Sequence, residues 1–159
     1  MNKFNIASFV AVLVLTASIA RAVAPQPVKS GTRDKCAVCG MFVAKYPDFA
    51  AQIHLKNGTV LHFDGPKDLF SYYLNPGQYR PKLAPQDVAA IYVTDYYSLT
   101  PVDATTASYV IGSDVFGPMG KEFIPFAKAK DAQGFLKDHK GKSILTFRQI
   151  NQGVLKGVQ

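Results

Sequence analysis

The alternation of apolar and polar residues predicts a β-hairpin early in the chain. Residues 49–55 alternate with the period of two that is typical of a strand. Asn57-Gly58 follows, and this dipeptide favours a two-residue hairpin turn, so residues 59–63 should form the returning strand. The pattern therefore begins with two antiparallel strands.

The period then changes to that of a helix. The apolar side chains at helical spacing are Leu69, Phe70, Tyr73 and Leu74. Asp64 can cap the start of this helix, Gly65-Pro66 lies in its first turn, and Asn75-Pro76-Gly77 ends it. Residues 88–93 are again apolar and should form the next strand.

The second half of the chain repeats this order. The expected elements are a strand at 107–111, a loop at 112–120, a strand at 122–126, a helix at 131–140 and a strand at 143–147. Pro125 places the strand at 122–126 near a sheet edge. The sequence therefore predicts an α+β fold of two tandem β-β-α-β units, residues 34–100 and 101–159. Neither unit is large enough to bury much core alone, so their faces should pack together.

The N-terminus has the features of a secretory signal peptide. A positive head at residues 1–3 precedes an apolar run, and Ala20-Arg21-Ala22 offers the small-x-small pattern of a cleavage site. The run is shorter than the roughly 20 residues that a membrane-spanning helix needs. We therefore expect residues 1–22 to be a cleaved signal peptide, residues 23–33 to be a flexible leader, and the protein to be periplasmic.

Composition and charge narrow the classes of function. The 159 residues are 48% hydrophobic and 18% charged, which is typical of a globular protein and excludes a disordered tail or coiled coil. The net charge of +7 falls to +5 when Lys3 and Arg21 leave with the signal peptide. No run of Lys and Arg is interleaved with aromatic residues, so we expect no nucleic-acid binding. Two cysteines are too few for a four-cysteine zinc site.

The two cysteines form a Cys36-x-x-Cys39 motif that permits several kinds of chemistry. Gly40 stands where covalent haem attachment needs a histidine, which excludes that function. A thiol–disulfide oxidoreductase remains an alternative, although no strand precedes Cys36 and no helix is expected to open after Cys39. A structural disulfide is a further alternative, because an exported protein meets an oxidising compartment.

A soft-metal site is the remaining interpretation. Thiolate and thioether sulfur are soft donors that select Cu(I). If Cys39 and Met41 lie in extended chain, both sulfurs point to one side, and Met119 in its Gly-Pro-Met-Gly loop could display a third sulfur or pack on the core. His54 and His62 could add donors, although histidines on strands are more often hydrogen-bonded or exposed to solvent.

Several motifs occur in a characteristic order after the signal peptide. They are Asp34-x-Cys36-x-x-Cys39-Gly40-Met41, Phe63-Asp64, Asp68-Leu69-Phe70, Tyr92-Val93-x-Asp95, Tyr109-Val110-x-Gly112-Ser113 and Pro118-Met119-Gly120. Together they resemble the NosL family, copper chaperones that serve the maturation of nitrous oxide reductase. The resemblance covers about residues 34–150, and the family is similar in having two β-β-α-β halves.

The resemblance implies that the protein binds Cu(I) outside the cytoplasm and hands it to nitrous oxide reductase, with an ATP-driven membrane transporter of the ABC type taking part. It assigns Cys39, Met41 and Met119 as Cu(I) ligands, and Cys36 as a further ligand or as a disulfide partner of Cys39. It implies no catalytic turnover, so we do not expect an enzyme. Many family members are lipoproteins anchored through a cysteine just after the signal peptide. No cysteine precedes Cys36, so we expect no lipid anchor.

Overall fold

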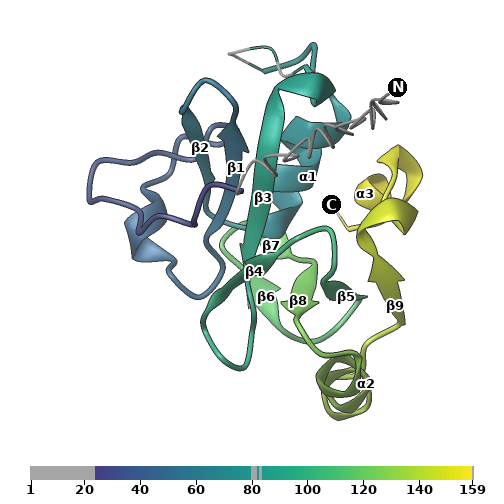
Figure 1. Cartoon of the computed structure of the whole chain (residues 1–159). Coiled ribbons are helices and arrows are strands. Elements are labelled where there is room, and N and C mark those ends of the chain that lie inside the picture. The colour runs from purple at the N-terminus through teal and green to yellow at the C-terminus, as the bar shows by residue number, and fades with distance from the viewer. Residues whose placement is uncertain (1–23, 80–81, 83, 159) are drawn as a thin grey trace, which may run out of the picture.

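The computed structural model describes residues 24–79, 82 and 84–158, so the signal peptide expected at residues 1–22 lies outside the described residues. Two antiparallel sheets lie side by side, with helices packed against them and a separate two-stranded hairpin (Figure 1). Among the described residues, no helix combines the length and apolar character needed to cross a lipid bilayer.

The first half builds a four-stranded sheet in the order β2-β1-β3-β4. Its strands are β1 (Ala51–Leu55), β2 (Val60–Phe63), β3 (Val88–Thr94) and β4 (Pro101–Asp103), and helix α1 (Pro66–Leu74) connects β2 to β3. Ile53 pairs with Leu61 on β2 and with Ile91 on β3, and all three side chains are buried with those of α1. Strand β4 carries the first sheet past residue 100, where the sequence suggested that the second unit begins.

The second half repeats the strand–strand–helix–strand order of the first. Its elements are β5 (Ser108–Ile111), β8 (Ile124–Phe126), α2 (Ala129–Asp138) and β9 (Ser143–Thr146). The sheet order is β8-β5-β9, which leaves Pro125 on an edge strand, as expected. The predicted α+β class is confirmed, with a β-β-α-β order in each half.

The hydrophobic pattern does not predict several short elements. They are strand β4, the hairpin strands β6 (Phe116–Gly117) and β7 (Gly120–Lys121), the 3₁₀ turns η1 (Val43–Lys45), η2 (Pro85–Asp87) and η3 (Phe147–Gln149), and helix α3 (Gln152–Gly157). Each of them is six residues or shorter, and a segment of that length completes too few periods for its spacing to be recognised.

The two halves share one aromatic core. Phe70, on α1, is 1% exposed and lies against three rings of the second half, with centroid distances of 5.2 Å to Tyr109, 5.1 Å to Phe123 and 5.3 Å to Phe147. Rings at these separations pack with tilted or edge-on geometry, which is favourable beyond the burial of their area. Helix α1 is therefore held from both sides, and this fixes where its N-terminal end lies.

Candidate metal centre

The segment from Cys36 to Met41 forms a tight, closed turn. The backbone N–H of Cys36 donates to the Met41 carbonyl at 2.8 Å, and that of Gly40 donates to the Cys36 carbonyl at 3.0 Å. Gly40 has a φ of +77°, a left-handed conformation that glycine adopts without steric penalty. The extended chain expected between Cys39 and Met41 is therefore wrong, because the backbone turns at the glycine between them.

The turn is fixed to β2, an edge strand of the first sheet. The backbone N–H of Ala37 donates to the His62 carbonyl at 2.9 Å, and Cys36 pairs with His62 in a short parallel bridge. Cys36 is consequently buried, with 3% of its surface exposed, whereas Cys39 is half-buried. The two thiols thus lie at different depths beside the same strand.

Two buried carboxylates face the two thiols. Cys36 Sγ donates to Asp68 Oδ2 at 3.2 Å, and Cys39 Sγ donates to Asp64 Oδ2 at 3.3 Å. Asp64 just precedes α1 and Asp68 lies in its first turn, so a spacing of four residues brings both side chains to one side of the helix. One ligand atom from each of the four residues lies within 4.8 Å of the others, which makes the cluster a candidate metal centre.

The carboxylate of Asp64 is fully buried without a counter-charge. Its Oδ1 atom has no hydrogen-bond partner. Within the residues that the structure describes, neither Asp64 nor Asp68 takes part in an ion pair. Burial raises the pKa of Asp68. A buried carboxylate is strongly unfavourable when it is ionised and unpaired, so this pair requires protons, hydrogen bonds or a bound cation.

Burial also raises the pKa of both thiols, that of Cys39 to about 11. The backbone N–H groups of Cys39, Asp64 and Val38 oppose this rise at Cys36, because they favour its thiolate. The backbone N–H of Met41 does the same for Cys39. Both thiols are therefore protonated at neutral pH without metal. Donors aimed at sulfur stabilise the thiolate once a cation has displaced the proton.

These features argue against a redox-active thiol pair. A reactive cysteine of the thioredoxin type has a depressed pKa and a place at the start of a helix. Here burial raises the pKa of both thiols, and the pair lies in a turn. Cys36 and Cys39 are both free thiols in the structure, and each donates to a carboxylate. The arrangement is compatible with a metal-binding pair.

Asp64 and Asp68 are candidate site residues that the hydrophobic pattern does not indicate. The capping role expected for Asp64 is wrong, since Gly65 is the N-cap of α1 and the Asp64 carboxylate faces Cys39 instead. The signal in the sequence was a pair of aspartates four residues apart in a chain that also carries a Cys-x-x-Cys motif.

Two thiolates with two carboxylates form a donor set that Zn²⁺ accepts, whereas Cu(I) prefers sulfur donors.

The two methionines approach this region from different segments. Met41 ends the cysteine turn and is half-buried. Met119 lies at the tip of the β6–β7 hairpin and is 46% exposed, so the loop displays this side chain rather than packing it into the core. Lys67, the neighbour of Asp68 on α1, donates its ammonium group to the Met119 carbonyl at 2.6 Å. The turn at residues 36–41 (the cysteine turn) and the β6–β7 hairpin at residues 116–121 (the Met119 hairpin) therefore meet at the same end of α1.

A buried glutamate ties this hairpin to α1. Glu122 Oε1 accepts from the backbone N–H groups of Lys67 at 2.5 Å and Phe123 at 2.8 Å. The carboxyl group thereby supplies the cap that Gly65 lacks. Gly65 and Gly117 leave room for it, because a Cβ on Gly117 would lie 2.9 Å from Glu122 Cγ and one on Gly65 would overlap Glu122 Oε2.

Glu122 should make the stability of the metal-free protein depend on pH. Burial raises the pKa of Glu122 from 4.5 to about 8. Between these values the folded protein keeps a proton that the unfolded chain has released, so rising pH lowers the free energy of unfolding. Glu122→Gln cannot titrate, so urea unfolding at a series of pH values should show the wild type losing stability relative to this variant from about pH 4.5 to about pH 8. A difference that stays constant over this window would contradict the assignment to Glu122.

Comparison with known proteins identifies the family to which this chain belongs. A family model for NosL matches residues 27–155. The chain belongs to the NosL family. A curated relative, "Copper-binding lipoprotein NosL" of Stutzerimonas stutzeri, is 30% identical over 133 residues, which cover 82% of this chain and 69% of the relative.

Two solved NosL structures are similar to this chain. The crystal structure of the copper chaperone NosL from Shewanella denitrificans aligns with a TM-score of 0.69 and 30% identity, over 80% of this chain and 97% of that one. The solution NMR structure of apo-NosL from Achromobacter cycloclastes aligns with a TM-score of 0.48 and 29% identity, over 66% of this chain and 87% of that one. The Shewanella structure confirms the NosL fold.

The two histidines considered as additional donors, His54 and His62, are engaged in other hydrogen bonds. His54 is buried, and its Nε2 atom lies 2.9 Å from Gln52 Oε1. His62 Nδ1 lies 3.0 Å from Ser30 Oγ, and its Nε2 atom lies 3.6 Å from Asp34 Oδ2. Burial lowers the pKa of both imidazoles, which keeps them neutral at pH 7. Neither belongs to the candidate metal cluster found among the described residues.

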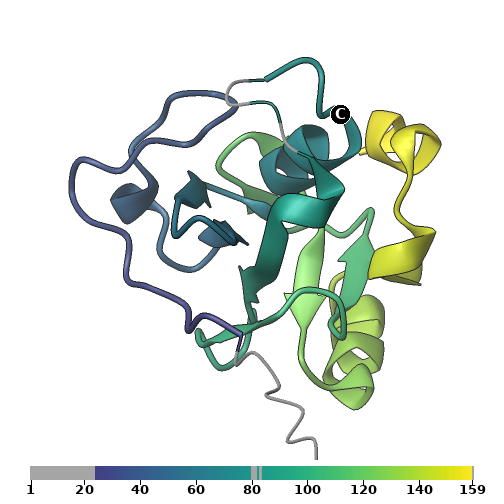
Figure 2. The same ribbon diagram turned by 45° about the horizontal axis from the view of Figure 1, so that its top comes forward.

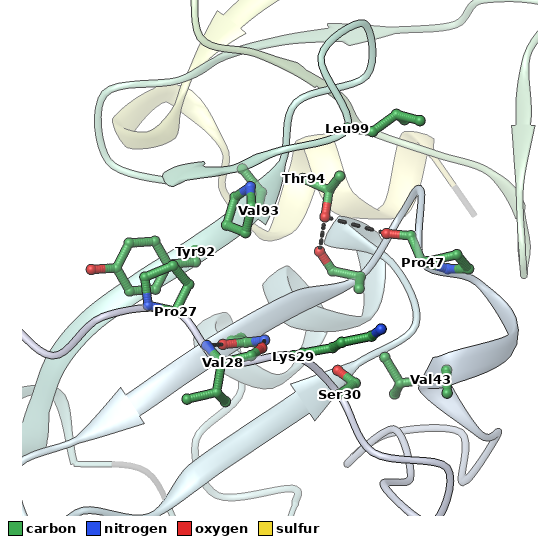
Figure 3. Close-up of a pocket in the computed structure, with 14 residues that line it drawn as sticks. Pro27, Val28, Lys29, Ser30, Val43, Pro47, Tyr92, Val93, Thr94 and Leu99 are labelled. Atoms are coloured by element: carbon green, nitrogen blue, oxygen red, sulfur yellow. Dashed lines mark hydrogen bonds between the residues drawn. The ribbon is translucent and has the colours of Figure 1, made fainter.

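The segment expected to be a flexible leader lies along the side of the first sheet that faces away from α1 (Figure 2). Residues 24–31 have no regular secondary structure there, but the backbone N–H of Val28 donates to Gln52 Oε1 at 3.1 Å and the Tyr92 hydroxyl donates to the Pro25 carbonyl at 2.7 Å. A mostly apolar cavity of about 330 Å³ lies beneath this segment. Its lining residues include Pro27, Val28, Tyr92 and Leu99 (Figure 3).

Proposed function

We propose that this protein is a periplasmic copper chaperone that binds Cu(I) through sulfur ligands and delivers it for assembly of the copper centres of nitrous oxide reductase. The Stutzerimonas relative is named a copper-binding lipoprotein, and the Shewanella structure is that of a copper chaperone. The observation that carries the proposal is the pair of free thiols packed against two buried carboxylates, neither of which forms an ion pair among the described residues. Such a cluster combines soft donors with negative charge, which together attract a thiophilic cation.

The Cu(I) ligands in this proposal are Cys39, Met41 and Met119, with Cys36 as a fourth sulfur. Cys39 and Met41 are half-buried and Met119 is exposed, so an acceptor protein can reach a sulfur-bound ion from solvent. The ligands of the acceptor can then replace the sulfur ligands of this protein one at a time, and the ion is transferred without being released as free copper. Thioether sulfur is neutral, so the methionines add soft donors without adding charge.

The place of action in this proposal is the periplasm. The N-terminal pattern supports export, and the name of the Stutzerimonas relative, a lipoprotein, agrees with it. The acceptor is nitrous oxide reductase, and an ABC-type membrane transporter takes part in assembling its copper centres. The protein transfers an ion and turns over no substrate.

A cell that encodes this chain and nitrous oxide reductase provides the test of the function. Deleting the gene should leave the reductase produced but poor in copper, because the acceptor then lacks its Cu(I) donor. A restored copy should return the copper content of the purified reductase, measured by elemental analysis and by its visible absorption. A copy that carries Cys39→Ser, exported to the same level, should leave the purified reductase poor in copper.

Full copper content in the deletion strain would contradict the proposed delivery. The remaining alternative, a thiol–disulfide oxidoreductase, is tested on the same purified protein by insulin reduction. Turnover of insulin by the reduced wild type, lost in Cys36→Ser, would favour that alternative over copper transfer.

A further inference from the structure

The hairpin that carries Met119 is too small to hold its own shape. Its two strands pair only Phe116 with Lys121 and Gly117 with Gly120. Isolated two-stranded hairpins are marginally stable even when their strands are longer, so the position of Met119 must be set by contacts outside the hairpin.

Two hydrogen bonds from Lys67 of α1 tie the hairpin and its flanking residue to the helix. The side chain of Lys67 is 8% exposed, and its ammonium group donates to the Met119 carbonyl at 2.6 Å. The backbone N–H of Lys67 donates to Glu122 Oε1 at 2.5 Å. Lysine is rarely buried, because its ammonium group must lose water. Lys67 therefore holds the hairpin at its tip and at the residue that follows β7.

The same turn of α1 also faces the thiols. Asp68 follows Lys67 directly and accepts from Cys36, and Asp64 lies three residues before Lys67 and accepts from Cys39. The cysteine turn and the Met119 hairpin are thus attached to one rigid segment of four to five residues. Their relative position therefore depends on where the N-terminal end of α1 lies.

We propose that Lys67 is the positioning residue of the copper site, because its ammonium group fixes the backbone of Met119 while leaving the thioether free to bind. This proposal rests on the proposed function, in which Met119 is a Cu(I) ligand. A ligand whose backbone is already ordered in the metal-free protein loses less conformational freedom when the ion binds. Lys67 itself donates to a carbonyl and offers no electron pair to the metal.

Lys67→Gln is the test variant, because glutamine is shorter and uncharged and cannot reach the Met119 carbonyl. The affinity for Cu(I), measured by anaerobic competition with a Cu(I) chelator, should fall roughly tenfold or more, the scale of losses seen for groups that orient metal ligands. Lys121→Gln is the matched control, since Lys121 lies in the same hairpin and is exposed. Its affinity should equal that of the wild type.

A double-mutant cycle with Met119→Leu separates positioning from general stability. If Lys67 acts through Met119, the Lys67→Gln change should lower affinity in the wild-type background and have no further effect in Met119→Leu. Unchanged affinity in Lys67→Gln, or losses that add in the double variant, would overturn the positioning role. If Met119→Leu alone leaves the affinity unchanged, the ligand set of the proposed function fails instead.

A measurement on the metal-free wild type needs no variant to fold. The backbone order parameters of Met119 and Gly120 from ¹⁵N relaxation should be about 0.85, the value of rigid backbone. Values below about 0.6 would overturn the proposal, because the Met119 backbone would then be mobile before copper binds.

Discussion

Replacing Cys39 by serine should lower the affinity for Cu(I) by at least about 100-fold, since losing a group that merely orients a metal ligand already costs roughly 10- to 100-fold. Cys39 is the half-buried member of the thiol pair and is the proposed first ligand. A serine hydroxyl is a hard donor with little affinity for Cu(I). Anaerobic competition between the reduced protein and a Cu(I) chelator measures the loss.

Val38→Ala is the matched control for this substitution. Val38 lies between the two cysteines in the same turn, is partly buried as Cys39 is, and offers no side-chain ligand. Its affinity for Cu(I) should equal that of the wild type, and both variants should keep the far-ultraviolet circular dichroism of the wild type. If Cys39→Ser retains copper as well as Val38→Ala does, the sulfur site is wrong.

Replacing Phe70 by alanine should lower the free energy of unfolding by about 3–5 kcal/mol, the usual result of removing a buried ring. The Phe70 side chain, on α1, is buried against the rings of Tyr109, Phe123 and Phe147. The substitution leaves a cavity where the two halves of the protein meet, so both halves should become less stable together. Urea unfolding of the metal-free protein, followed by circular dichroism, measures the change.

Phe116→Ala removes the same ring from a position that is 63% exposed, and it serves as the control. The free energy of unfolding of this variant should stay within about 0.5 kcal/mol of the wild type, as for most surface substitutions. Similar losses in the two variants, or a small loss in Phe70→Ala, would contradict the view that α1 joins the halves through one core.

The first β-hairpin could be predicted because its signals are local. The alternation over residues 49–55, the Asn57-Gly58 dipeptide and the apolar run at 59–63 lie within fifteen residues of one another, and β1 and β2 form at Ala51–Leu55 and Val60–Phe63. Turn chemistry and the period of two act between neighbours in the chain, so they remain visible without the rest of the fold.

The conformation of the cysteine turn could not be predicted in the same way. Cys39-Gly40-Met41 is compatible with extended chain, but Gly40 is left-handed in a turn that closes between Cys36 and Met41 and pairs with β2. Asp64 was expected to cap a helix because its position before Gly65-Pro66 permits this. Its carboxylate faces Cys39 instead, and no local rule decides between the two partners.

The amino-acid sequence by itself determined the α+β class, the order of the main strands and helices and the resemblance to NosL, since periodicity, turns and motifs are properties of neighbouring residues. It also indicated the sulfur ligands that we propose for copper. Only the tertiary structure decided that Asp64 and Asp68 lie against the thiols and that Lys67 and Glu122 hold the Met119 hairpin. These contacts join residues between 25 and 55 positions apart. Their partners are chosen by how the sheets and α1 pack, which is a property of the whole core.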